Sequence, residues 1–338
     1  MRLLLLTALL ALAGPAVAND TMSQLGTGGL VFITSDDVSM DSEDLSVGPK
    51  QVKVVYHFTN HGEADQHALV AFPLPDITGD GDFMVSIPTE DPQNLFGFTT
   101  TFDGKPVETT LHRYAFAVGI DQTELLKSLG VPLAPFGLAT IDALNALSAE
   151  QQQNLMHLGL VIPMTYDDGG GEKTDYTPIW TLKSTYSWEA DFAAGKTAEV
   201  VHTYTPSLGG TVATTFLAPP TPDEDRGRDY RAKYCTDDGL IKTLKAAQHD
   251  PEDPYSVPYV EQWLSYIWST GANWGGSIGK FHLSIDKGDA KNLVSFCWDG
   301  EVTKTGPTSF EMDATDWLPP YNHELEILIL AHQDQNTG

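Results

Sequence analysis

Basic residues are scarce in this sequence. Its 338 residues include 19 Lys and Arg against 46 Asp and Glu, which gives a formal net charge of −27. A polyanion of this strength repels the phosphate backbone of nucleic acids and the anionic surface of a lipid bilayer. The composition therefore argues against a nucleic-acid partner. It leaves solubility, divalent cations or a basic partner protein as explanations for the excess acid.

Cysteine is rarer still, because only Cys235 and Cys297 occur. Two cysteines alone are too few for a structural zinc site, which takes four ligands. In an oxidising compartment a lone pair of this kind forms a disulfide. Closing a loop over their separation of 62 residues stabilises a fold by about 4 kcal/mol in the chain-entropy model. The sequence predicts this disulfide, with a catalytic cysteine as the alternative.

Long hydrophobic runs are missing after the N-terminus, where no segment approaches the roughly 20 apolar residues of a spanning helix. The chain opens with MRLLLLTALLALAGPAVA, in which one Arg precedes an apolar run that ends in Ala16-Val17-Ala18. This run is short for a membrane anchor and typical of a secretory signal peptide cut after Ala18. We therefore expect an exported protein, periplasmic or secreted, without a transmembrane segment.

Internal repeats of fixed period are also absent, and short strand patterns dominate instead. QVKVVYHFTN (51–60) and IWTLKSTYSW (179–188) alternate apolar with polar residues, as half-buried strands do. YVEQWLSYIWST (259–270) is rich in aromatic and β-branched residues, which favours a strand with KFHLSID (280–286) as its hairpin partner. Short strands separated by turns indicate antiparallel sandwiches.

Helical periodicity is clearest around residues 138–159, where Ser148 is a suitable N-cap for a second helix, and shorter helices are expected at TELLKSLG (123–130) and DDGLIKTLKAAQ (237–248). The predicted fold class is therefore mainly β, with two antiparallel β-sandwich-like domains and a small helical insert. The expected boundaries are a signal peptide (1–18), an N-terminal β-sandwich domain (19–120), the insert (121–165) and a C-terminal domain containing the disulfide (166–338).

Three segments together resemble one bacterial family. They are NDTMSQLGTGGLVFITSDDVSMDSEDLSV (19–47), VVYHFTN with ALVAFPLPDI (54–77), and TGANWGGSIGKFHLSIDKGDAKNLVSFC (270–297). The chain resembles the exported family catalogued as domain of unknown function 4424, over about residues 19–332. This resemblance implies export but no particular activity. A shorter stretch, YHFTN with VAFPLP and a DGK turn, is similar to the vault protein inter-alpha-trypsin domain, a β-sandwich interaction module.

The third segment contains GGSIG (275–279), which fits the G-x-S-x-G signature of a hydrolase nucleophile elbow. That elbow needs a helix after the serine, whereas a strand pattern follows Ser277. Of the histidines after it, His282 is too close, and His323 and His332 belong to a final strand and its tail. We therefore predict no catalytic residue here and assign the glycines to a hairpin turn. Trp274, beside Gly275 and Gly276, is either buried under the loop or presented to a ligand.

Two groups of residues have metal-ligand chemistry. Asp76, Asp80 and Asp82 offer hard oxygens to calcium, although their spacing is not that of an EF-hand and an acidic surface loop is the alternative. His57, His61 and His67 flank one hairpin turn and offer nitrogens to zinc, with ordinary surface histidines as the alternative. No other cofactor is expected.

These patterns favour a non-enzymatic module that binds or scaffolds another component of the cell envelope, either a protein or a glycan. The alternative is a glycan-directed hydrolase or lectin that uses acidic and aromatic residues. That alternative predicts a cleft with facing carboxylates beside exposed tryptophan rings, and Trp188, Trp274 and Trp298 are its candidates.

Overall fold

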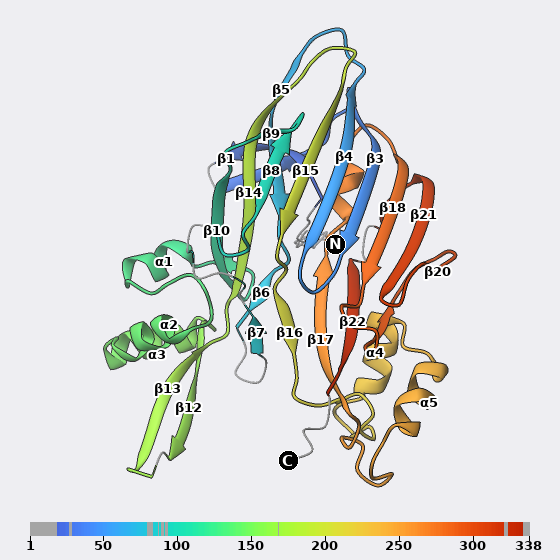
Figure 1. Ribbon diagram of the computed structural model, residues 1–338. Helices are drawn as coiled ribbons and strands as arrows, with labels where there is room; N and C mark the ends of the chain where they lie inside the picture. Colours follow the sequence, from blue (N-terminus) through green and yellow to red (C-terminus); the bar gives the residue numbers. More distant parts are fainter. Residues whose placement is uncertain are drawn as a thin grey trace, which may run out of the picture.

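The computed structural model describes residues 19–333, apart from 27–28, 80–83, 87, 89–90, 92–93, 168 and 321–323. The fold is mainly β, as predicted, with three multistranded sheets and a separate hairpin (Figure 1). The expected signal peptide lies outside the described residues. Among the helices of the described chain, none is long and apolar enough to cross a membrane.

Sheet A has seven strands, with the order β11-β10-β14-β5-β1-β2 and with β6 paired to β14. Its strands are β1 (Thr21–Gly26), β2 (Gly29–Ile33), β5 (Gln66–Pro73), β6 (Ile77–Thr78), β10 (Thr110–Ala117), β11 (Ile120–Asp121) and β14 (Thr181–Phe192). In β14 the alternating residues from Leu182 to Trp188 are buried, as the sequence pattern predicts.

Sheet B has eight strands in the order β20-β21-β18-β3-β4-β15-β8-β9. Its strands are β3 (Val38–Val47), β4 (Val52–Asn60), β8 (Thr99–Phe102), β9 (Lys105–Pro106), β15 (Thr197–Tyr204), β18 (Ile278–Asp286), β20 (Thr303–Lys304) and β21 (Ser309–Trp317). In sheet B the pairing of β3 with β18 is parallel, and the other strand pairings are antiparallel.

Sheet C has five strands in the order β19-β22-β17-β16-β7. Its strands are β7 (Met84–Ser86), β16 (Leu208–Gly210), β17 (Tyr259–Tyr266), β19 (Leu293–Phe296) and β22 (Leu325–His332). The strand assignment of residues 259–266 is confirmed, but the predicted hairpin with 280–286 is wrong. β17 pairs with β16 and β22, and the chain leaves it through a 3₁₀-helix, η1 (Ser269–Asn273), to reach sheet B.

Sheets A and B pack face to face, and sheet C continues the same core. Phe72 of sheet A lies 4.9 Å, centroid to centroid, from the His202 ring of sheet B, and Tyr266 of sheet C belongs to the same buried cluster. Strands from both sides of the insert therefore share sheets and one core. The expected boundary at residue 120 does not separate the sheets, because the long-range pairings that unite them leave no mark on local sequence.

The helical insert has its own small core. It contains α1 (Thr123–Ser128), α2 (Leu138–Asn145) and α3 (Ala149–His157), followed by the hairpin of β12 (Val161–Asp167) and β13 (Glu172–Pro178). Ser148 caps α3 through a capping box with Gln151, which confirms the predicted cap. The boundary expected at residue 166 falls inside β12, so the insert reaches Pro178.

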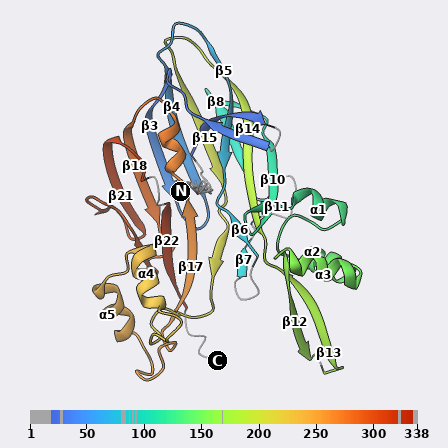
Figure 2. The same cartoon turned by 180° about the vertical axis from the view of Figure 1, so that it is seen from behind.

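Two further helices lie on the other side of the molecule from the insert (Figures 1 and 2). They are α4 (Arg226–Tyr234) and α5 (Asp238–Ala246), and each begins at an aspartate whose carboxylate accepts a backbone N–H bond. Their apolar faces pack on Leu328 and Leu330 of β22. Of the two helices, the sequence predicts α5 only.

Candidate functional site

A cleft of about 390 Å³ opens where the end of β5 meets sheet C. One side comes from the segment after β5 and from β6, and the other from β16, β17 and the start of β22. We call it the A–C cleft. Its lining residues are Leu74, Pro75, Asp76, Ile77, Thr78, Phe96, Tyr204, Pro206, Ser207, Gly209, Lys233, Trp263, Leu264, Ser265, Ile267, Glu324 and Glu326.

Local sequence explains why the cleft exists. Pro73 and Pro75 cannot donate ladder hydrogen bonds, so β5 ends at Pro73 and the pairing with β14 becomes irregular until β6 resumes it. On the opposite side, Gly209 of β16 lies against the Trp263 ring, and a Cβ there would come within 2.7 Å of a ring carbon. Glycine therefore lets β16 approach β17 while the indole stands in the cleft wall.

Three carboxylates line the A–C cleft, and each has a partner. Asp76 lies 3.0 Å from Lys183 Nζ, and Glu326 lies 3.5 Å from Lys233 Nζ. Burial raises the pKa of both acids, and the neighbouring lysines act in the opposite direction. Both pairs are partly exposed, so the charges remain accessible to a ligand.

Glu324 is held differently, because it caps η1. Its carboxylate accepts hydrogen bonds from the Ser269 hydroxyl at 2.7 Å and from the backbone N–H of Trp268 at 3.0 Å. Burial raises the pKa of Glu324 from 4.5 to about 7, although these hydrogen bonds favour the charged form. The group is therefore poised to change charge near neutral pH.

The aromatic wall combines Trp263 with Tyr204 and Phe96. Tyr204 is 4% exposed, and no residue in the described part of the chain provides a hydrogen-bond partner for its hydroxyl. A buried hydroxyl without a partner is costly. Tyr204 lines the cleft, but its hydroxyl oxygen is itself buried behind the wall. The cleft thus offers apolar rings and oxygen acceptors, a combination suited to ligands with hydroxyl or ammonium donors.

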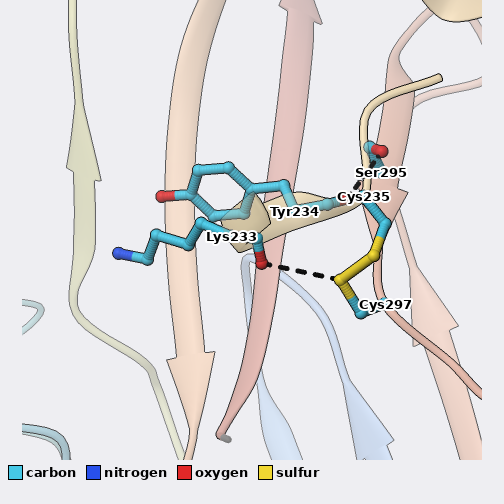
Figure 3. The surroundings of a disulfide bond; sticks show 5 residues. All are labelled: Lys233, Tyr234, Cys235, Ser295 and Cys297. Atoms are coloured by element: carbon cyan, nitrogen blue, oxygen red, sulfur yellow. Dashed lines mark hydrogen bonds between the residues drawn. A yellow bond between two sulfur atoms is a disulfide. The ribbon is translucent and has the colours of Figure 1, made fainter. Parts of the chain in front are cut away.

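The disulfide predicted from the sequence is present and joins Cys235 to Cys297 (Figure 3). Cys235 ends α4 in the left-handed conformation, and Cys297 follows β19. Ser295 donates a hydrogen bond to the Tyr234 carbonyl, which ties the same two segments together. Because Lys233 precedes this anchor by two residues, the disulfide fixes the backbone from which the lysine reaches Glu326.

The structure buries Trp274 and leaves it out of the cleft. Its ring is 3% exposed and packs 4.3 Å, centroid to centroid, from Phe58. Its indole N–H donates to the carbonyl of Asp20. Gly275 and Gly276 continue the loop, and Ser277 is followed by strand β18 rather than by the helix that a nucleophile elbow requires.

The described metal candidates each have another partner, and the calcium set is described only in part. Asp76 pairs with Lys183, and Asp80 and Asp82 lie outside the described residues. His57 and His61 contact Ser42 and Ser39, and His67 contacts Asp191. Within the described ranges, no group of three or more His, Cys, Asp or Glu is placed to hold a metal ion.

Sequence reasoning missed most of the A–C cleft. Glu324 and Glu326 come from HELEILIL, where acids at every second position interrupt an apolar strand. That alternation was the available signal, since the acids share the face opposite Leu325 and Ile327, which are buried. Lys233 and Trp263 carry no comparable local signal, because their neighbours in the cleft come from other parts of the chain.

The fold and the cleft define a mainly β protein with an open, acidic and aromatic cleft between two sheets. The chain belongs to the family described as "Domain of unknown function (DUF4424)", whose match covers residues 18–328. Among curated proteins, no relative matches the chain.

One solved structure similar to this chain is that of a Legionella pneumophila protein named "putative nutrient binding protein". It is 13% identical, with a TM-score of 0.45, and the likeness covers 93% of this chain and 70% of that one. A likeness of this degree does not transfer function. The similarity to the vault protein inter-alpha-trypsin domain stays a prediction.

Proposed function

We propose that this protein is an exported, non-enzymatic binding module of the cell envelope and that the A–C cleft is its ligand site. The observation that supports this most directly is the cleft wall itself. The rings of Trp263 and Tyr204 line the same cleft as Asp76 and Glu326, which are paired with lysines. An arrangement of acceptors and aromatic rings favours a small ligand that carries several hydroxyl or ammonium donors and one apolar face.

The paired state of the acids supports binding over catalysis. A glycosidase needs one carboxylic acid to donate a proton and a second carboxylate to act as base or nucleophile. Here Asp76 and Glu326 are held by lysines, and Glu324 is held as a helix cap. Each lysine contacts one oxygen of its acid and favours the charged form of that acid, which cannot donate a proton.

Thermal shift with defined probes tests this proposal. Wild-type protein is screened against putrescine, spermidine, chitobiose and cellobiose at millimolar concentration, and a bound probe raises the Tm by mass action. We expect the rise to disappear in Trp263→Ala and Glu326→Gln. It should persist in Asp313→Asn, a matched acid of a second hollow over sheet B.

Two results would count against the binding proposal. A rise that survives both cleft substitutions places binding elsewhere, and a full panel without any rise removes the support for this ligand class.

The second candidate is a glycan-directed hydrolase or lectin, and one observation favours it. Glu324, whose pKa is raised to about 7, lies in the same cleft as Trp263. Trp188 and Trp274 are buried in the core and Trp298 is half-buried, so the rings named from sequence give this candidate little support. Turnover of nitrophenyl glycosides that is lost in Glu324→Gln would establish the hydrolase and overturn the non-enzymatic proposal.

A further inference from the structure

The first described residues of the chain are buried in the middle of the molecule. Asn19 and Asp20 both have 0% exposure. They lie among polar side chains from sheets B and C and from η1. We call this group the N-terminal polar cluster, and its members are Asn19, Asp20, Glu43, Tyr56, Thr100, His202, Tyr266 and Thr270.

Asn19 uses its whole polar surface in this cluster. Its side-chain amide donates to Glu43 at 3.1 Å and to the carbonyl of Trp268 at 2.9 Å. Its side-chain oxygen accepts from the hydroxyls of Tyr56 at 2.9 Å and Tyr266 at 2.7 Å. These four hydrogen bonds fix the position of the Asn19 side chain, much as a binding site fixes a polar ligand.

The segment TGANW (270–274) forms the wall around residues 19–21. The backbone nitrogen of Asn19 donates to the Thr270 hydroxyl, and the same hydroxyl donates to the Asn19 carbonyl. A Cβ on Gly271 would come within 2.8 Å of the side-chain nitrogen Nδ2 of Asn19, so only glycine leaves room for the Asn19 side chain. The indole of Trp274 holds the carbonyl of Asp20.

The cluster has more acid than base. Asp20 contacts His202 Nε2 at 3.0 Å, but within the described residues no lysine or arginine forms an ion pair with Asp20 or Glu43. With Asn19 in peptide linkage, burial raises the pKa of Glu43 from 4.5 to about 8. A buried carboxylate is stable as a charge only when a cation accompanies it.

We propose that the mature chain begins at Asn19 and that its α-ammonium group is bound inside the N-terminal polar cluster, against the Thr270 hydroxyl and alongside Glu43. Hydrolysis of the Ala18–Asn19 peptide bond consumes one water and leaves a carboxylate on Ala18 and an ammonium group on Asn19. An external signal peptidase supplies the catalyst. The new positive charge is the cation that the cluster lacks, so leader removal completes the core.

Chemical labelling of the wild-type amine tests this directly. The full gene is expressed with its leader, and the intact mass of the purified protein should correspond to a chain starting at Asn19. N-hydroxysuccinimidyl acetate should then acetylate the α-amine at least about tenfold more slowly in native protein than in urea, because labelling requires local opening. A chain that starts elsewhere, or an amine that reacts equally fast in both conditions, would overturn the proposal.

A one-residue extension provides the energetic test. Chains starting at Asn19 and at Ala18 are produced by cleaving a fusion, and the second moves the charge away by one residue. We expect its Tm to be roughly 5 °C lower or more. The Tm difference should shrink when Glu43→Gln is present in both chains. Equal Tm values for the two starts, or a difference that Glu43→Gln leaves unchanged, would contradict the ion pair. If the extended chain does not fold, the labelling result decides.

Discussion

The N-terminal polar cluster and the A–C cleft use the same residue types in opposite settings. Both combine acids with tyrosine, and in both burial raises the pKa of a glutamate, Glu43 in one and Glu324 in the other. The cluster is closed, since Glu43 is 1% exposed. The cleft is open, with Glu326 at 27% and its partner Lys233 at 52% exposure.

The difference shows how exposure decides what an acidic group does. In the closed cluster each polar atom is fixed by the fold, so its partners contribute to stability and specify one arrangement. In the open cleft the ion pairs are screened by water and contribute little to stability. Their lysines are partly exposed and therefore accessible to a ligand as well as to solvent. Residue type alone does not distinguish these roles.

Two His–Asp pairs provide the largest expected contrast. Asp20→Ala leaves the fully buried His202 without its partner and should lower the free energy of unfolding by about 3–5 kcal/mol. The matched control is Asp313→Ala, which removes the equally short but exposed bond to His282 and should cost less than about 1 kcal/mol. Urea denaturation measures both values. Similar losses for the two variants would remove the distinction between closed and open settings.

Loss of the disulfide should affect both stability and the A–C cleft. Cys235→Ser with Cys297→Ser should lower the free energy of unfolding by about 2–4 kcal/mol, because the 62-residue loop is no longer closed. The double substitution should also weaken the binding of any probe that contacts Lys233 and Glu326, because the disulfide lies two residues from Lys233. Denaturation and thermal shift on the same variant measure the two effects. Unchanged probe affinity would show that α4 positions Lys233 without the disulfide.

The pH dependence of stability should reveal Glu324. Its pKa is 4.5 in the unfolded chain and about 7 in the fold, so the folded state binds the proton more tightly. The resulting stabilisation is complete below pH 4.5 and is lost as the pH rises towards 7. The Tm difference between wild type and Glu324→Gln should therefore change across this window and be flat above it. A constant difference would show that Glu324 titrates at its ordinary pKa.

The smallest expected effect is that of Lys183→Met in the open region. Its ion pair with Asp76 is partly exposed, so the free energy of unfolding should fall by less than about 1 kcal/mol. Removing the lysine leaves Asp76 free to accept a donor, so a cationic probe such as putrescine should bind more tightly. Calorimetric titration measures the affinity. A large loss of stability would mean that this pair is structural.

Local patterns in the sequence predicted the elements better than their arrangement. The alternation of residues 51–60 and the cap at Ser148 are read from neighbouring residues, and the structure confirms both. The parallel pairing of β3 with β18 joins segments some 240 residues apart, and no local pattern encodes it. The same limit applies to the site. The sequence indicated Asp76 as a candidate calcium ligand. In the structure it pairs with Lys183, which comes from another strand and is not near it in the sequence.

The position of β1 and β3 also sets the order in which the molecule can assemble. These strands are among the first to be synthesised, yet β3 pairs with β18, and residues 19–21 need the wall formed by residues 270–274. Contacts so distant along the chain form slowly, because the entropy of closing a long loop is lost before the contact contributes its stabilising energy. One edge of β3 must therefore wait for β18 until nearly the whole chain has been synthesised, although β3 can pair with β4, and β1 with β2 and β5, much earlier. During that interval a chaperone that shields exposed strands would have the most to protect.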